Sequence, residues 1–226
     1  MLQGVALVLG LLLVGGFGLI ALDYRPYNVP TGSMSPAIAV GDTVLGRRID
    51  GASVVRGDVV VFRDAAWGNE VMVKRVVGVG GDTVVCCDPQ GRLTVNGTPV
   101  DERYLHQSAV TSGEPFSAKV PAGRLFLLGD NRVGSLDSRV HLTVLAGTVP
   151  TTDVLARVEA TVWPWDRVGA RTGTTAFAAL GTAPSRPGPL IPAAYAMAAG
   201  TVVILLTSMT GPVAGLVRRL RGWSRG

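Results

Sequence analysis

The sequence predicts a mostly β protein: an antiparallel sheet domain flanked by N- and C-terminal transmembrane helices. Three observations lead to this prediction. Short valine-rich runs bounded by Gly or Asp fill the middle of the chain, as strands do. No long amphipathic helix pattern interrupts them. Each end of the chain has a long run without a charged side chain, namely residues 1–22 and 187–217.

The first of these runs, residues 1–22, is predicted to be an uncleaved transmembrane anchor. About 20 apolar residues at 1.5 Å rise span a hydrocarbon core of roughly 30 Å. The alternative is a cleaved signal peptide, which would have a basic start, a shorter apolar core and a small-x-small cleavage site. The segment has no basic residue, exceeds that length and shows no clean cleavage site, so the sequence favours an anchor.

The domain that follows, residues 23–168, reads as a series of short strands. RLTVNGTPV carries Asn96-Gly97 between two apolar runs, and this dipeptide is a strong hairpin signal. The other predicted strands lie at Asp42–Ile49, Asp58–Arg63, Glu70–Val79, Asp82–Asp88, Arg124–Gly129 and Val154–Trp163.

After the domain, residues 169–189 are rich in Gly, Ala, Thr and Pro and are expected to form a linker. Residues 190–217 are predicted to be a second transmembrane helix, with a buried core helix as the alternative. The tail, residues 218–226, holds four arginines, and basic residues beside a span mark the cytoplasmic side. Both termini are therefore expected in the cytoplasm, with the domain outside the cell membrane.

Composition and charge limit the class of protein and the kinds of molecule that it is expected to bind. Hydrophobic residues make up 47% and charged residues 16%, which argues against disorder and is consistent with a membrane protein. The net charge is +5, yet all 16 acidic residues and 15 of the 21 basic residues lie between Asp23 and Arg167. That region is nearly neutral, so the sequence predicts no nucleic-acid partner.

The chain has only two lysines, Lys74 and Lys119, among 21 basic residues. Strand alternation places Lys74 on one face with Met72 and Val76. Burial among apolar neighbours lowers the pKa of a lysine, and a neutral amine is a general base for a hydroxyl within hydrogen-bond reach. Ser33, on a Gly-containing turn after the first hydrophobic run, can supply that hydroxyl.

Each feature also has a simpler explanation. Lys74 alone fits a surface lysine, and Ser33 alone fits a loop shaped by Gly and Pro. A histidine base would have to be His106 or His141, neither in a recognisable catalytic context, and the G-x-S-x-G elbow is absent. The adjacent Cys86 and Cys87 are either two small core residues or a disulfide between neighbours. No zinc spacing or phosphate loop occurs, so no metal or other cofactor is predicted.

Four stretches, in order, carry a family resemblance: Tyr24–Asp42 with PTGSMSP, Arg56–Arg63 with RGDVVVF, Val73–Asp82 with KRVVG, and Leu128–Arg139 with GDNRVGSLDSR. Together, behind an N-terminal anchor, they closely resemble bacterial type I signal peptidases, the membrane proteases that remove secretory signal peptides. The similarity covers most of residues 24–163. Because lysine occupies the position of the base, the resemblance is to the prokaryotic branch.

The resemblance implies a role for each matching residue. Ser33 matches the nucleophile and Lys74 the general base. Thr31 matches a hydroxyl that joins the Ser33 N–H in the oxyanion hole. Ser135 matches a serine that hydrogen-bonds and orients the lysine. The supporting residues of this wall are Asp130, Asn131, Arg132, Asp137 and Arg139.

The resemblance also implies the reaction, which is cleavage of secretory preproteins after small residues of the A-x-A kind, through an acyl-enzyme. Expected partners are signal peptides and the lipid bilayer. The sequence leaves the oligomeric state open. It departs from the family at Val133-Gly134, where two polar residues are common. A catalytically silent, membrane-anchored binding module is the alternative from a different class.

Overall fold

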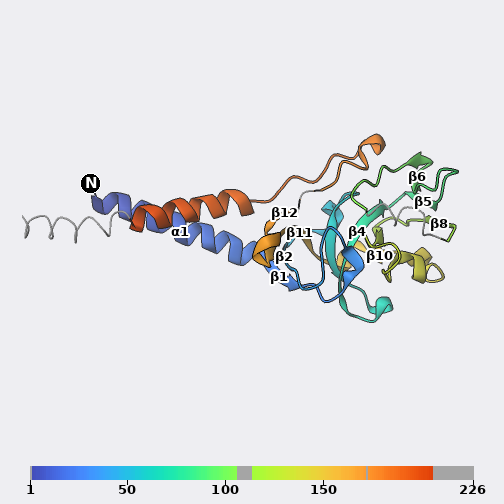
Figure 1. Ribbon diagram of the computed structural model, residues 1–226, viewed down its shortest axis with the longest axis horizontal. Coiled ribbons are helices and arrows are strands. Elements are labelled where there is room, and N and C mark those ends of the chain that lie inside the picture. Colours follow the sequence, from blue (N-terminus) through green and yellow to red (C-terminus); the bar gives the residue numbers. More distant parts are fainter. Residues whose placement is uncertain (1, 106–113, 172, 206–226) are drawn as a thin grey trace, which may run out of the picture. The chain divides into compact units, whose positions relative to one another are not determined.

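The computed structural model describes residues 2–105, 114–171 and 173–205. It divides into two compact units, one made of the segments at the two chain ends and the other a β domain, Tyr24–Pro187 (Figure 1). The domain carries every site residue predicted from the sequence.

Two helices form the described part of the terminal unit. Helix α1 spans Leu2–Asp23, and a second helix runs over 190–205. They contact each other at Gly16, where a Cβ atom would lie 2.9 Å from Met197 Cγ. In the described part of the chain, no helix combines the length and apolarity that crossing a bilayer requires. The two predicted spans are therefore not confirmed, and residues 206–226, with the end of the second span and the basic tail, lie outside the described residues.

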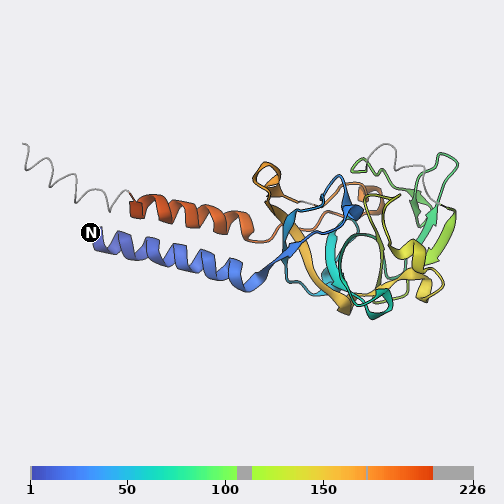
Figure 2. The same cartoon turned by 60° about the horizontal axis from the view of Figure 1, so that its bottom comes forward.

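The predicted antiparallel β architecture is confirmed. Eight strands form the larger sheet in the order β1-β2-β11-β3-β4-β9-β10, with β12 paired to β11. Figure 2 shows the strands of this domain curving round its core. The strands are β1 (Tyr24–Asn28), β2 (Thr43–Arg47), β3 (Val59–Arg63), β4 (Val71–Val79), β9 (Arg124–Leu128), β10 (Val149–Pro150), β11 (Val154–Trp163) and β12 (Gly169–Ala170).

A smaller sheet has the order β7-β6-β5-β8. The predicted hairpin at Asn96-Gly97 joins β6 to β7, and both turn residues have positive φ, 53° and 76°. Asparagine and glycine tolerate this conformation better than other residues, which explains why they occupy the turn. The strands are β5 (Thr83–Cys86), β6 (Thr94–Val95), β7 (Thr98–Pro99) and β8 (Phe116–Lys119).

One of the buried clusters in the domain fixes the position of the loop after β1. Met34 and Ile38, which follow the PTGS turn, are almost fully buried. They belong to the same apolar cluster as Ala156 and Val158 of β11. Burying two large apolar side chains contributes on the order of a few kcal/mol, so the PTGS turn is tied to the centre of the sheet.

The segment expected to be a linker contributes to the domain. Gly169 and Ala170 form β12 on β11. Phe177 is fully buried in the cluster that contains Phe126 and Leu128 of β9. Gly, Ala and Thr-rich composition is typical of linkers, yet strand pairing through β12 and the buried Phe177 side chain hold this segment on the domain.

Candidate active site

The structure brings together the two side chains that the sequence paired. Lys74 Nζ lies 2.9 Å from Ser33 Oγ, and both side chains are buried, at 4% and 7% exposure. Lys74 is on β4, between β3 and β9, where it pairs in register with Val60. Ser33 lies in the 3-10 turn Gly32–Met34. Strand alternation and the buried Met34 together place the amine against the hydroxyl.

Burial sets the electrostatics of Lys74. Loss of solvent lowers its pKa below the usual value, while the carboxylates of Asp137 and Asp130 oppose the shift and only partly offset it. Nζ also contacts the Val73 carbonyl oxygen at 3.2 Å. A neutral amine 2.9 Å from the Ser33 hydroxyl can accept its proton, so the pair has the geometry of a nucleophile and its base.

Thr31 lies on the same turn as Ser33. It occupies the position before the 3-10 turn, in an extended conformation, and its Oγ1 is 3.4 Å from Ser33 Oγ. Its hydroxyl is therefore close to the nucleophile, and its place in an oxyanion hole stays a prediction.

Asn131 links the loop after β9 to the Ser33 turn. Its backbone N–H donates to the Ser33 carbonyl oxygen at 3.0 Å, and its side-chain amide donates to the Gly32 carbonyl oxygen at 3.1 Å. The Gly134 N–H in turn contacts Asn131 Oδ1 at 3.2 Å. Val133 is exposed. The loop is thus closed by the backbone and side chain of Asn131, and none of these hydrogen bonds uses a side chain at residues 133–134.

Asp130 anchors the same loop to the neighbouring strand. Both of its carboxylate oxygens accept from the Arg75 guanidinium, at 2.8 and 2.6 Å. Arg75 also donates to the Gly57 carbonyl oxygen at 2.9 Å and lies over the Tyr104 ring at 4.2 Å. Arg75 and Asp130 are almost fully buried. Breaking a pair of this kind leaves an uncompensated buried charge.

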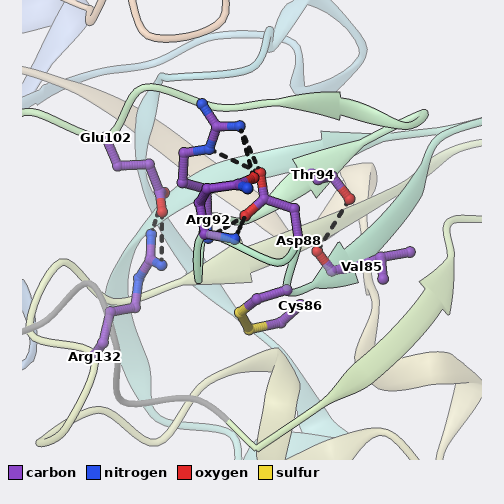
Figure 3. Close-up of a disulfide and its surroundings, with 9 residues drawn as sticks. Val85, Cys86, Asp88, Arg92, Thr94, Glu102 and Arg132 are labelled. Atoms are coloured by element: carbon purple, nitrogen blue, oxygen red, sulfur yellow. Dashed lines mark hydrogen bonds and ion pairs between the residues drawn. A yellow bond between two sulfur atoms is a disulfide. The ribbon is translucent and has the colours of Figure 1, made fainter.

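Arg132 extends this network to residues that the sequence did not single out. Its guanidinium binds both carboxylate oxygens of Glu102, as Figure 3 shows. Glu102 also accepts from the Tyr104 hydroxyl at 2.6 Å. Burial raises the pKa of Tyr104 well above its usual value, and the Glu102 carboxylate adds to the effect. Neither Glu102 nor Tyr104 lies in a motif, so no sequence signal identifies them.

Asp137 and Arg139 support the end of β9. Asp137 is fully buried and accepts from the Gly129 N–H at 3.0 Å, while Arg139 binds its two oxygens at 2.8 Å each. Arg139 also donates to the Arg132 carbonyl oxygen at 2.7 Å. These contacts hold the segment that follows β9, and the supporting role that the resemblance implies stays a prediction.

Ser135 differs from the expectation. Its Oγ is buried and has no hydrogen-bond partner among the described residues. The predicted hydrogen bond from Ser135 to Lys74 is therefore not formed in this structure. Ser135 nevertheless lies at the site, because its side chain packs directly against Gly129, which also abuts the Ser33 carbonyl oxygen.

Gly129 leaves no room for a side chain. A Cβ atom there would lie 2.1 Å from Ser135 Oγ and 2.5 Å from the Ser33 carbonyl oxygen. Gly129→Ala is expected to lower the free energy of unfolding by about 1–3 kcal/mol, the usual cost of overpacking. Chemical denaturation measures this loss. Gly169→Ala is the control, because a Cβ at Gly169 meets no atom within 4 Å, and equal stability of the two variants would contradict the close approach.

The histidine alternative receives no support from the described residues. His141 stacks on Trp67, with ring centroids 4.4 Å apart, and His106 lies outside the described residues. In the described part of the chain, the side chains hydrogen-bonded to Ser33 Oγ are Lys74 and Thr31. The arrangement therefore favours a lysine base.

The two cysteines, left open by the sequence, form a disulfide between neighbours at the end of β5 (Figure 3). Cys86 belongs to the apolar cluster under the small sheet, and Cys87 is exposed. The disulfide lies on the smaller sheet, whereas Ser33 and Lys74 belong to the larger one and its loop.

Comparisons with known proteins identify the family of the chain. A family model described as signal peptidase, peptidase S26, matches residues 2–163. A probable signal peptidase I of Mycobacterium leprae is 31% identical over 204 residues, covering 64% of this chain and 70% of that protein. A signal peptidase I of Leptolyngbya laminosa is 30% identical over 178 residues, covering 75% and 83%. A crystal structure of a signal peptidase I from Enterococcus faecalis matches with 28% identity and a TM-score of 0.39, over 46% of this chain and 96% of that one.

Proposed function

The chain belongs to the signal peptidase family, peptidase S26, and on this premise we propose that it cleaves N-terminal signal peptides from secretory preproteins with Ser33 as nucleophile and Lys74 as general base. The protein is a serine peptidase of the signal peptidase I type. The observation that carries the proposed assignment is the 2.9 Å contact between two buried side chains, Lys74 Nζ and Ser33 Oγ.

Acylation follows from this contact. Neutral Lys74 accepts the Ser33 proton as Oγ attacks the scissile carbonyl carbon, and the carbonyl oxygen becomes an oxyanion. The Thr31 hydroxyl and the Ser33 N–H are proposed to stabilise that oxyanion, a contribution of roughly 3–4 kcal/mol per donor. The Lys74 ammonium then protonates the departing amine, which leaves as the mature protein, and the signal peptide remains as an ester on Ser33.

Deacylation uses the same base. Lys74, again neutral, accepts a proton from water as the water oxygen attacks the ester carbonyl carbon. The second tetrahedral intermediate collapses, Ser33 Oγ takes the proton back from Lys74, and the signal peptide leaves with a free carboxylate. Arg cannot replace lysine in these steps, because its guanidinium does not lose a proton in proteins.

The proposed substrate is an extended peptide with small residues before the cleaved bond, the specificity that the family resemblance implies. An extended chain can add to a sheet by backbone hydrogen bonds. Val133, Leu136 and Val140, on the loop that supports the site, are exposed apolar residues. Such a surface suits the apolar segment of a signal peptide better than a charged substrate.

Membrane anchoring is part of the proposal and rests on the sequence. Residues 1–22 and 187–217 carry no charge, and arginines follow the second run. We expect two spans, with both termini in the cytoplasm and the β domain outside the cell membrane.

A cleavage assay across pH tests the proposed function. Detergent-purified protein is expected to convert a preprotein with an A-x-A site into a single mature product, whose new N-terminus is determined by mass spectrometry. Because only neutral Lys74 acts as a base, kcat/KM should rise with pH through a pKa that burial has lowered from 10.5. It should fall as the pH drops and the amine becomes protonated.

Two results would contradict the proposal. An intact preprotein after incubation with folded protein at pH 9 would favour a silent binding module. Cleavage at an unrelated position would indicate a different specificity.

A further inference from the structure

A pocket away from the dyad is rich in arginine. It has a volume of about 510 Å³ and is open to solvent on the β domain. Arg47 and Arg48 at the end of β2, Arg157 on β11 and Arg186 line it, together with Asp50 and Ser185. Ser33 and Lys74 do not, so the proposed cleavage reaction gives this pocket no role.

Carboxylates compensate only part of the arginine charge. Glu159 binds Arg157 at 2.8 Å and lies 4.0 Å from Arg47. Among the described residues, Arg48 and Arg186 form no ion pair. Two of the four guanidinium groups are thus left without a carboxylate, and the other two share one.

The remaining carboxylates near the pocket already hold other groups. Asp50 accepts the Ala52 N–H at 2.9 Å and caps the short turn that follows it. Asp58 accepts from the Ser185 hydroxyl at 2.8 Å and from the Val55 N–H at 3.1 Å. These bonds engage one oxygen of each carboxylate, Oδ1 of Asp50 and Oδ2 of Asp58. Among the described residues, neither carboxylate forms an ion pair with an arginine of the pocket.

Arg47 adds an independent observation. Its Nε is buried and has no hydrogen-bond partner among the described residues. Buried hydrogen-bond donors in folded proteins nearly always have an acceptor, so a buried donor without one is unusual and needs an explanation. An oxygen atom of a bound anion would supply the missing acceptor.

We propose that this pocket binds a phosphate group, as a phosphate ester or the headgroup of an anionic phospholipid. Guanidinium groups bind phosphate oxygens through two parallel N–H donors, which favours phosphate over monatomic anions. The volume of the pocket is within the range of small-molecule sites and exceeds what phosphate alone needs. A glycerol phosphate unit is therefore the probe that fits both sources.

The two segments that join the β domain to the hydrophobic helices give a reason to test phospholipid headgroups as the source of the phosphate. Arg47 pairs in register with Tyr24, the residue after α1. Arg186 lies four residues before the helix over 190–205. One pocket residue is thus paired with the residue that follows α1, and another precedes the second helix by four residues. Under the membrane anchoring proposed above, this makes an anionic phospholipid headgroup a candidate source of the phosphate. Phosphate binding itself does not depend on the cleavage reaction.

The test uses the full chain in a maltoside detergent, which contains no phosphorus. Glycerol 3-phosphate is titrated and its ³¹P signal followed by NMR. We expect broadening with the wild-type protein and at least a five-fold weaker affinity for the double variant Arg48→Gln, Arg186→Gln. Arg63→Gln is the matched control, since Arg63 is exposed and lies outside the pocket. Thermal unfolding verifies that each variant is folded.

Lipid competition separates the two sources. Displacement of glycerol 3-phosphate by phosphatidylglycerol, but not by phosphatidylcholine at the same concentration, supports the headgroup. Binding of glycerol 3-phosphate that neither lipid displaces supports a soluble phosphate ester. Absence of binding, or equal affinity of the double variant and Arg63→Gln, overturns the proposal. Because this readout needs no preprotein, its failure is distinguishable from failure of the cleavage function.

Discussion

Replacing Lys74 by Ala is expected to lower kcat/KM for preprotein cleavage by at least about 10³-fold. General-base catalysis contributes typically 10²–10⁴-fold, and Lys74 is the base in both chemical steps of the proposed mechanism. Lys74→Arg should be equally inactive, because the arginine guanidinium stays protonated and so cannot accept the Ser33 proton. Cleavage of the same preprotein at pH 9, followed by electrophoresis, measures the loss.

Lys119→Ala is the matched control, since Lys119 is the other lysine of the chain and is exposed on β8. It should retain the wild-type rate. Ser33→Ala should be as inactive as Lys74→Ala, and the double variant should lose little more, because residues that act as a unit are not additive. An active Lys74→Arg enzyme would remove the dyad assignment.

The Asp130→Ala variant is expected to lose about 3–5 kcal/mol in the free energy of unfolding. It would leave the guanidinium of Arg75, which is 5% exposed, without its carboxylate, and breaking a buried pair from one side carries this cost. The same substitution releases the loop that holds the Ser33 turn, so cleavage should fall as well. Urea unfolding monitored by circular dichroism measures the change.

Asp101→Ala provides the control, because Asp101 and Arg103 form an ion pair that is exposed, at 62% and 88%. Exposed pairs contribute about 0–1 kcal/mol. The double variant Arg75→Met, Asp130→Leu should be less destabilised than Asp130→Ala, since it removes both buried charges. If Asp130→Ala were no less stable than Asp101→Ala, the buried pair would not have the structural role described here.

Much of the β domain is predictable from local patterns. The valine-rich runs correspond to β2 to β5, β9 and β11, since apolar residues with strand propensity are needed wherever a sheet covers a core. The hairpin at Asn96-Gly97 follows from the φ values that this turn requires. By contrast, β1 has the sequence YRPYN and a mostly exposed pattern. An edge strand pairs on one side only, so it tolerates Pro26 and shows little apolar periodicity.

The sequence predicts the roles of some site residues and gives no signal for others. Lys74 and Ser33 could be paired because alternation, scarcity of lysine and the family motifs agree. Glu102 and Tyr104 could not, because their role depends on contacts with Arg132 and Arg75 that arise only when distant segments meet. The missing hydrogen bond of Ser135 is likewise a matter of side-chain geometry, which no motif encodes.

The Ser33 turn rests on β11 through Met34, and β11 in turn pairs with β2. Its supporting loop comes from residues that follow β9. A ribosome must therefore deliver more than 150 residues before the nucleophile has its surroundings. During synthesis, the contact between Ser33 and Lys74 therefore cannot acquire its folded surroundings until most of the β domain has left the ribosome.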